Sequence, residues 1–185
     1  NEQQSEPNDI IQETHQQRLI TLALADQVEE ARWSAPALPN GQTLHDALAI
    51  LLAWDEWAIA VFEVSLLRAL PARLTLPASN GDEAQAYEAR AQTRSAPLSK
   101  NDLLGGLQVA ATRLITAAVG RGAPDWQERR LADLAGLSLF ADAQGTPMVG
   151  DVVRWLVARE RTLDAQISEG LGVSVDLDEL RKRLA

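Results

Sequence analysis

The chain has 185 residues, of which 46% are hydrophobic, enough for one domain with a buried core. Lys and Arg number 17 against 26 Asp and Glu, so the net charge is −9, and we expect no binding to nucleic acid or to an anionic membrane. The absence of Cys excludes disulfides and zinc–thiolate sites, and fits a cytoplasmic protein. Because the first residue is Asn rather than Met, we expect a trimmed or processed chain.

The first predicted elements are a disordered segment, residues 1–8, and a core helix over 9–33 whose apolar residues recur only loosely at helical spacing. A connection rich in Pro and Gly leads to Thr43. With Asp46 three residues later, Thr43 has the spacing of a capping box and starts the second core helix. Apolar residues cover most of this helix as far as Leu70, so it is the predicted central helix of a bundle.

The middle of the chain predicts one surface helix and one further core helix. Residues 82–94 are polar and Ala-rich, which favours a helix on the surface. Ser99 and Asp102 repeat the capping-box spacing and open the third core helix, which glycines end after Ala118. A short helix is expected over 124–137, because a Pro can occupy its first turn.

The last core helix is predicted to begin at Thr146, an N-cap followed by Pro147. Residues 173–185 are expected to form a charged C-terminal helix that packs on the bundle. No hydrophobic alternation typical of β-strands appears. The sequence therefore predicts an all-α domain over 9–172, a four-helix bundle with long crossover connections and short accessory helices.

Two carboxylates interrupt the apolar faces of predicted core helices. Asp55 lies within the most apolar stretch of the second helix, and Glu160 lies between Leu156 and Leu163 on the last one. A buried charge costs several kcal/mol, as an order of magnitude, unless it is paired or neutralised. The pattern therefore predicts a polar pocket inside the bundle, between the second and the closing helix.

Each carboxylate has a catalytic and a structural interpretation. In the catalytic one, Glu160 or Asp55 activates water or protonates a substrate, because desolvation raises the pKa of a carboxyl group. In the structural one, Asp55 forms an ion pair with Arg154 or Arg159, which is the commoner arrangement for a buried acid.

The candidate ligand-binding residues are aromatic or basic. Trp54, Trp57 and Trp155 could form the wall of a pocket beside Arg159, although large aromatic residues on central helices more often belong to the core. His45 lies in the first turn of its helix, near the mouth of the bundle. It could supply acid–base chemistry, although an exposed His is the commoner outcome there.

Three segments, in this order, match the pattern of a known superfamily. Residues 41–55 combine a Gly-x-Thr-apolar-x-Asp helix start with an apolar-Ala-Trp-acid sequence. Residues 82–114 place an Ala- and Arg-rich helix, a break and a long helix in series. Residues 145–167 begin with Gly-Thr-Pro and end with Gln-Ile. Together they resemble the DinB-like superfamily of four-helix bundles, in particular the ClbS/DfsB branch of small detoxification and self-resistance proteins.

The resemblance also identifies where this chain departs from the superfamily. Metal-binding members place a His four residues before the Trp of the second helix, and a His-x-x-x-His pair on the closing helix. The matching positions here are Ile50, Arg159 and Leu163. Because Ile and Leu cannot coordinate a metal, we predict neither a metal nor a cofactor. A residual site built on His45 and carboxylates would select a transition metal poorly.

These observations lead to two hypotheses of different classes. The first is a small-molecule binding protein, with metal-independent hydrolysis that inactivates a small organic molecule in a carboxylate and Trp pocket. The second is a non-catalytic structural or interaction protein, a homodimer that kept the bundle and lost the metal site. An open cavity that reaches both carboxylates would favour the first, and a filled core with both carboxylates in salt bridges would favour the second.

Overall fold

The computed structural model describes residues 2–67, 81–119 and 149–184, and these residues are almost entirely helical. Besides two short 3₁₀ turns and one isolated β-bridge between Pro36 and Thr43, the described part contains no strand. The prediction of an all-α fold is confirmed. The helices are α1 (Glu2–Gln27), α2 (Leu44–Leu67), α3 (Gly81–Ser95), α4 (Lys100–Val119), α6 (Val149–Leu171) and α7 (Leu177–Leu184).

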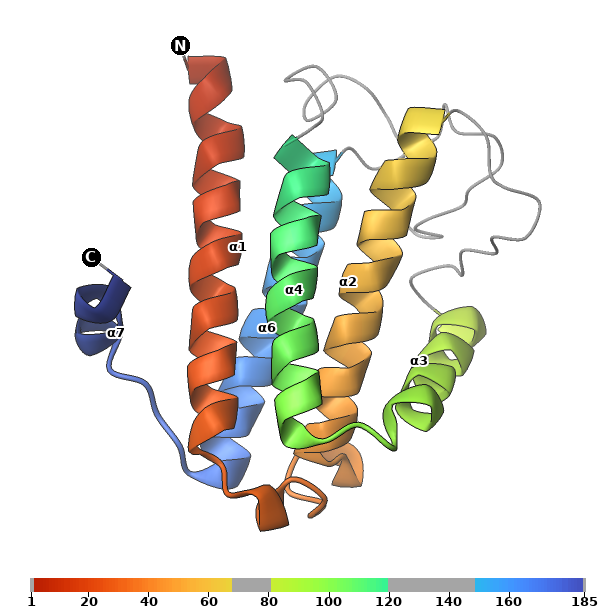
Figure 1. Cartoon of the computed structure of the whole chain (residues 1–185), viewed down its shortest axis with the longest axis vertical. Coiled ribbons are helices and arrows are strands. Elements are labelled where there is room, and N and C mark those ends of the chain that lie inside the picture. Colours follow the sequence, from red (N-terminus) through yellow and green to blue (C-terminus); the bar gives the residue numbers. More distant parts are fainter. Residues whose placement is uncertain (1, 68–80, 120–148, 185) are drawn as a thin grey trace.

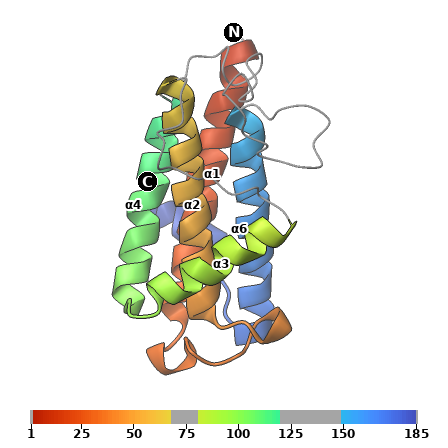
Figure 2. The same ribbon diagram turned by 90° about the vertical axis from the view of Figure 1, so that its right-hand side faces the viewer.

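Four long helices, α1, α2, α4 and α6, form the bundle, and α3 lies obliquely across its outer side (Figures 1 and 2). The colours in Figure 1 show that α2 and α4 run in the same direction, opposite to α1 and α6. The most extensive helix contacts join α2 to α4 and α1 to α6. Because α2 and α4 are parallel neighbours, the connection between them must return along the bundle, and it is one long crossover connection of the predicted kind.

The predicted N-cap at Thr43 and the predicted capping box at Ser99 are both present at the starts of core helices, although only the second has both reciprocal bonds. The backbone N–H of Asp46 donates to Thr43 Oγ1 at 3.0 Å, at the start of α2. At the start of α4, the N–H of Asp102 donates to Ser99 Oγ at 3.2 Å, and the N–H of Ser99 donates back to Asp102 Oδ2 at 3.0 Å. These bonds satisfy backbone donors that the helices themselves leave free.

The ends of several elements differ from the sequence-based expectations. Helix α1 begins at Glu2 rather than after residue 8, and ends at Gln27 rather than near Trp33. Gln and Glu are good helix formers, so the helix continues beyond its apolar face. The expected end of α2 near Leu70, the helix over 124–137 and the cap at Thr146 all lie outside the described residues.

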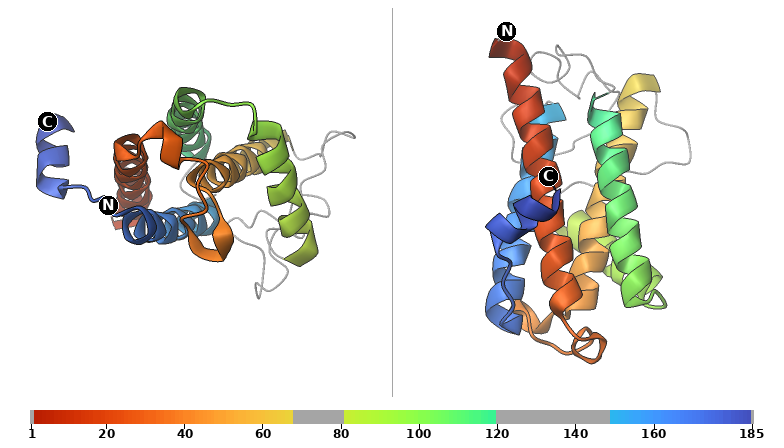
Figure 3. Two further views of the ribbon diagram at one scale, coloured as in Figure 1. Left: turned by 90° about the horizontal axis from the view of Figure 1, so that it is seen from below. Right: turned by 60° about the vertical axis from the view of Figure 1, so that its left-hand side comes forward.

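The C-terminal helix α7 stands beside α1, apart from the four core helices, in both Figure 1 and Figure 3. From the sequence, this helix is expected to pack on the bundle. Instead Val173 and Val175, in the link before α7, pack against the core, while Leu177 at its start is 46% exposed.

The hydrophobic core consists of two clusters stacked along the bundle. One contains Ile10, Trp54, Leu114 and Leu156, and the other contains Leu24, Leu48, Leu103 and Ile167, each with further members. Between them, α1 places buried polar side chains on its core face, namely Thr14, Gln17, Arg18 and Thr21. This interruption explains why the apolar pattern of the first helix is loose in the sequence.

One helix in the described part, α4, is long and apolar enough by length and composition alone to cross a membrane. Its side chains Leu103, Leu107 and Leu114 are buried in the bundle. A core helix of a four-helix bundle meets the same criteria, so this feature is weak evidence for a membrane span.

Candidate functional site

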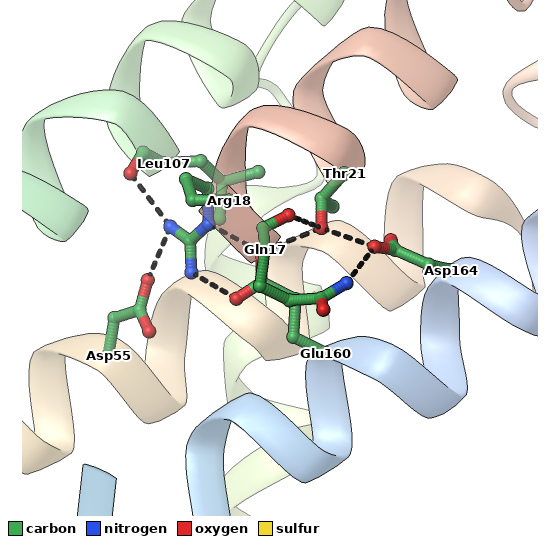
Figure 4. Close-up of polar contacts among 7 residues, drawn as sticks. All are labelled: Gln17, Arg18, Thr21, Asp55, Leu107, Glu160 and Asp164. Atoms are coloured by element: carbon green, nitrogen blue, oxygen red, sulfur yellow. Dashed lines mark hydrogen bonds and ion pairs between the residues drawn. The ribbon is translucent and has the colours of Figure 1, made fainter. Parts of the chain in front are cut away.

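The centre of the bundle contains an ion-pair network organised by Arg18 (Figure 4). Arg18 Nε donates to Glu160 Oε1 at 2.7 Å, and Nη2 donates to Glu160 Oε2 at 3.2 Å. Its Nη1 donates both to Asp55 Oδ2 and to the Leu107 backbone carbonyl, each at 2.8 Å. One guanidinium group therefore connects all four core helices.

A second part of the network joins α1 to α6 through Thr21. Its hydroxyl lies 2.7 Å from Glu160 Oε1 and 3.0 Å from Asp164 Oδ2, and Asp164 Oδ2 also accepts a 2.6 Å bond from Gln17 Nε2. The single hydroxyl proton of Thr21 cannot be donated to both carboxylates. A protonated Asp164 would supply the hydrogen that this arrangement lacks.

The electrostatics of the layer agree with this geometry. Burial raises the pKa of Asp164 to about 7, and the neighbouring Glu160 charge adds to the effect. Burial also raises the pKa of Asp55 to about 6, although Arg18 opposes the shift. Burial alone would lower the pKa of Arg18, but Asp55 and Glu160 outweigh it and raise that pKa above its ordinary value. Three buried acids, Asp55, Glu160 and Asp164, thus lie around one buried cation, Arg18. A proton bound to one of these acids reduces the negative charge that Arg18 does not compensate.

The expected partner of Asp55 is corrected by these contacts. The partner predicted from the sequence was Arg154 or Arg159, whereas Asp55 pairs with Arg18 on α1. Arg154 contacts Asp151 one turn earlier on its own helix, and Arg159 pairs with Glu88. The closing helix α6 therefore supplies two acids, Glu160 and Asp164, to the buried layer, while its two arginines form ion pairs outside that layer.

A cleft of about 290 Å³ lies between α2 and α6, the two helices that the sequence analysis selected. Ile50, Arg159 and Leu163, the three positions that match metal ligands in the superfamily, all line it. The remaining lining residues are Gln42, Ala47, Leu51, Glu88, Thr162 and Gln166. Neither Asp55 nor Glu160 belongs to the lining, so the cleft and the buried carboxylates are separate features.

Arg159 is held at the edge of this cleft by aromatic and acidic neighbours. Its guanidinium carbon lies 5.4 Å from the ring centre of Trp54 and 5.1 Å from that of Trp155. Its Nη2 donates to Glu88 Oε1 at 2.8 Å, and the same oxygen accepts a 2.9 Å bond from Trp54 Nε1. Cation–π contacts and a shared acceptor fix the orientation of this side chain.

The other candidate ligand-binding residues lie elsewhere. Trp57 is buried and packs against Trp54 and Trp155, with ring centres 5.4 and 5.8 Å apart, as a core residue would. His45 lines a different hollow, beside Trp33 and Lys100, and its Nε2–H donates to the Leu98 carbonyl at 3.0 Å.

Within the described residues no group of three or more His, Asp or Glu side chains is arranged to hold a metal ion. Ile50 and Leu163 offer no donor atom at the positions that would matter most. The residues present at the cleft therefore do not fit a transition metal.

Sequence reasoning missed Arg18, Gln17 and Thr21 on α1 and Glu88 on α3. A signal for the first three was present, because polar residues at helical spacing continue the line from Ile10 to Leu24 on one face of α1. Glu88 carried no comparable signal, since it lies in a polar helix where acids are common.

The fold defines the class of protein as an all-α four-helix bundle with a crossing helix between its second and third core helices. No protein-family model matches the sequence, and no curated protein matches it either. Among solved structures, the chain is similar to the Sibling Lethal Factor precursor DfsB, with a TM-score of 0.70, 12% identity, and coverage of 88% of this chain and 93% of that one.

It is also similar to an uncharacterised protein from Escherichia coli UTI89, with a TM-score of 0.69, 10% identity, and coverage of 92% of this chain and 95% of that one. The DfsB-like fold expected from the three sequence segments is thereby confirmed. At such low identity the likeness concerns the fold alone.

Proposed function

We propose that this protein binds a small organic molecule in the cleft between α2 and α6, and does so without a metal. The observation that carries the proposal is that Ile50, Arg159 and Leu163 line one open cleft. Where metal-binding relatives would place three ligands, this chain places an apolar wall and one cation. Such a lining can hold an organic molecule, and it cannot hold a transition metal.

The contacts of the two candidate catalytic carboxylates support a structural role, because both are in salt bridges with Arg18 and the cleft reaches neither of them. By the criterion stated above, this favours a non-catalytic protein, and the homodimer in that hypothesis stays a prediction. Asp55 is 1% exposed, Glu160 is 2% exposed, and Arg18 binds both. An ion pair of this kind leaves neither carboxylate free to meet a substrate in the cleft. Hydrolysis by Glu160 and Asp55 therefore stays a prediction, and binding is the function that the geometry supports better.

A fragment screen followed by NMR tests the proposal. We expect binding fragments to shift amide signals of cleft residues on both α2 and α6. The variant Gln166→Trp should abolish these shifts because the indole would fill the cleft. Gln108→Trp, the same substitution at an exposed position of α4, should leave them unchanged. If no fragment shifts the cleft signals, or if Gln166→Trp binds as the wild type does, the proposal is refuted.

The hydrolytic version is tested with the variant Glu160→Gln. Each bound fragment that contains a hydrolysable bond is incubated with wild type and variant, and products are measured by mass spectrometry. Product formed by the wild type and lost in a variant that remains folded would support catalysis by Glu160. Unchanged turnover in the variant would end that assignment. Urea unfolding must accompany the assay, because Glu160 also binds Arg18.

A further inference from the structure

The charge of Arg159 is only partly used by its neighbours. Within the described part of the chain, its guanidinium group makes one hydrogen bond, from Nη2 to Glu88 Oε1 at 2.8 Å. The guanidinium carbon lies over the rings of Trp54 and Trp155, 5.4 and 5.1 Å from their centres. The remaining N–H groups lie along the edge of the guanidinium plane, and Arg159 lines the cleft. The guanidinium group of Arg159 thus has N–H donors that a molecule in the cleft can reach.

Glu88 leaves this charge accessible. A single oxygen of its carboxylate, Oε1, accepts the bonds from both Arg159 and Trp54. The side chains of Arg159 and Glu88 are 37% and 28% exposed, so neither is sealed in the core. A guanidinium group binds carboxylates through two parallel N–H···O bonds, and this geometry is stronger and more specific than a single bond.

The wall beside Arg159 has the opposite character. Ala47, Ile50, Leu51 and Leu163 supply apolar surface from α2 and α6. A ligand that matches both parts carries an acidic group at one end and a hydrocarbon or aromatic body at the other. A neutral polar ligand could accept a hydrogen bond from Arg159 but would bring no opposite charge to it. An amine would be repelled by Arg159, and Glu88, whose carboxylate lines the same cleft, is already paired with that arginine.

We propose that the cleft binds a small organic acid, whose carboxylate is held by Arg159 and whose apolar body lies against Ile50 and Leu163. This inference rests on the proposed function and specifies its ligand class. In the ligand-free protein Glu88 occupies one donor of Arg159, so the incoming carboxylate competes with it. Glu88 is therefore a residue that weakens binding of acids and disfavours strongly anionic ligands.

Matched acid and amide probes test the ligand class. Hexanoate and hexanamide, and benzoate and benzamide, are titrated into the wild-type protein, and the amide signals of the cleft are followed by NMR. We expect each acid to bind at least tenfold more tightly than its amide. In Arg159→Gln the acids should lose this advantage. In Arg161→Gln, the same substitution at an exposed residue that pairs with Glu13, the advantage should remain.

A second variant keeps the test informative if Arg159→Gln perturbs the Trp packing. Glu88→Gln retains an acceptor for Trp54 and Arg159 and removes the competing charge, so acids should bind several-fold more tightly to it. Equal affinity for acids and amides in the wild type, or weaker acid binding in Glu88→Gln, would overturn the ligand class. Amide binding in the cleft that Gln166→Trp abolishes would then still uphold the proposed function.

Discussion

Replacing Asp164 by Asn tests whether the buried layer holds a proton. Asp164 shares the Thr21 hydroxyl with Glu160 and accepts from Gln17, an arrangement that needs one more hydrogen than Thr21 supplies. Burial accordingly raises the pKa of Asp164 from 3.8 to about 7 in the folded protein. Asn is an uncharged near-isostere of the protonated acid, so it resembles the state that the wild type adopts in mildly acidic solution.

The sign of the pH dependence follows from the raised pKa. Because the folded state binds a proton that the unfolded state has released, stability is present at low pH and is lost as the pH rises through about 7. One pKa unit corresponds to about 1.4 kcal/mol, so Asp164 should lower the free energy of unfolding by roughly 2–3 kcal/mol between about pH 5 and pH 8. Asp164→Asn removes this contribution.

Urea unfolding, followed by Trp fluorescence across that pH range, measures the effect. The stability of Asp164→Asn relative to the wild type should rise by roughly 2–3 kcal/mol from acidic to alkaline pH. Asp9→Asn, at an exposed position of α1, controls for the loss of a surface charge and should show no such trend. A difference between Asp164→Asn and wild type that does not change with pH would refute the neutral Asp164.

Three further outcomes are expected. Arg18→Gln should lower the free energy of unfolding in urea by about 3–5 kcal/mol, because it leaves two buried carboxylates without their cation. A loss below about 1 kcal/mol would contradict a stabilising role of this ion-pair network. Gly170→Ala should destabilise the protein, since the new methyl group would overlap the Ala37 carbonyl oxygen, whereas Gly105→Ala, which has open space, should stabilise it by about 0.5–1 kcal/mol. Protein purified without chelators or a His-tag should carry no stoichiometric divalent metal in elemental analysis. One ion per chain would contradict the interpretation that the cleft residues do not fit a transition metal.

Local chemistry was sufficient to predict the main elements of the fold. The N-cap at Thr43 and the capping box at Ser99 mark the starts of two core helices, because the side chains that satisfy free N–H groups lie within the same turn. The same holds for the burial of Asp55 and Glu160, which follows from the apolar residues around them on each helix. The sequence also indicated the two helices between which the cleft lies, but of the candidate site residues only Arg159 is in its lining.

Only the tertiary structure decided which groups meet. Arg18 lies 37 residues from Asp55 and 142 from Glu160, and Glu88 lies 71 from Arg159. Such pairs depend on how each helix is rotated and shifted against its neighbours, and the periodicity of a single helix does not contain that information. For the same reason, the sequence indicated a buried acid and an aromatic pocket as one site. In the packed bundle, Asp55 and Glu160 pair with Arg18 in the core. Arg159, beside Trp54 and Trp155, lines the cleft instead.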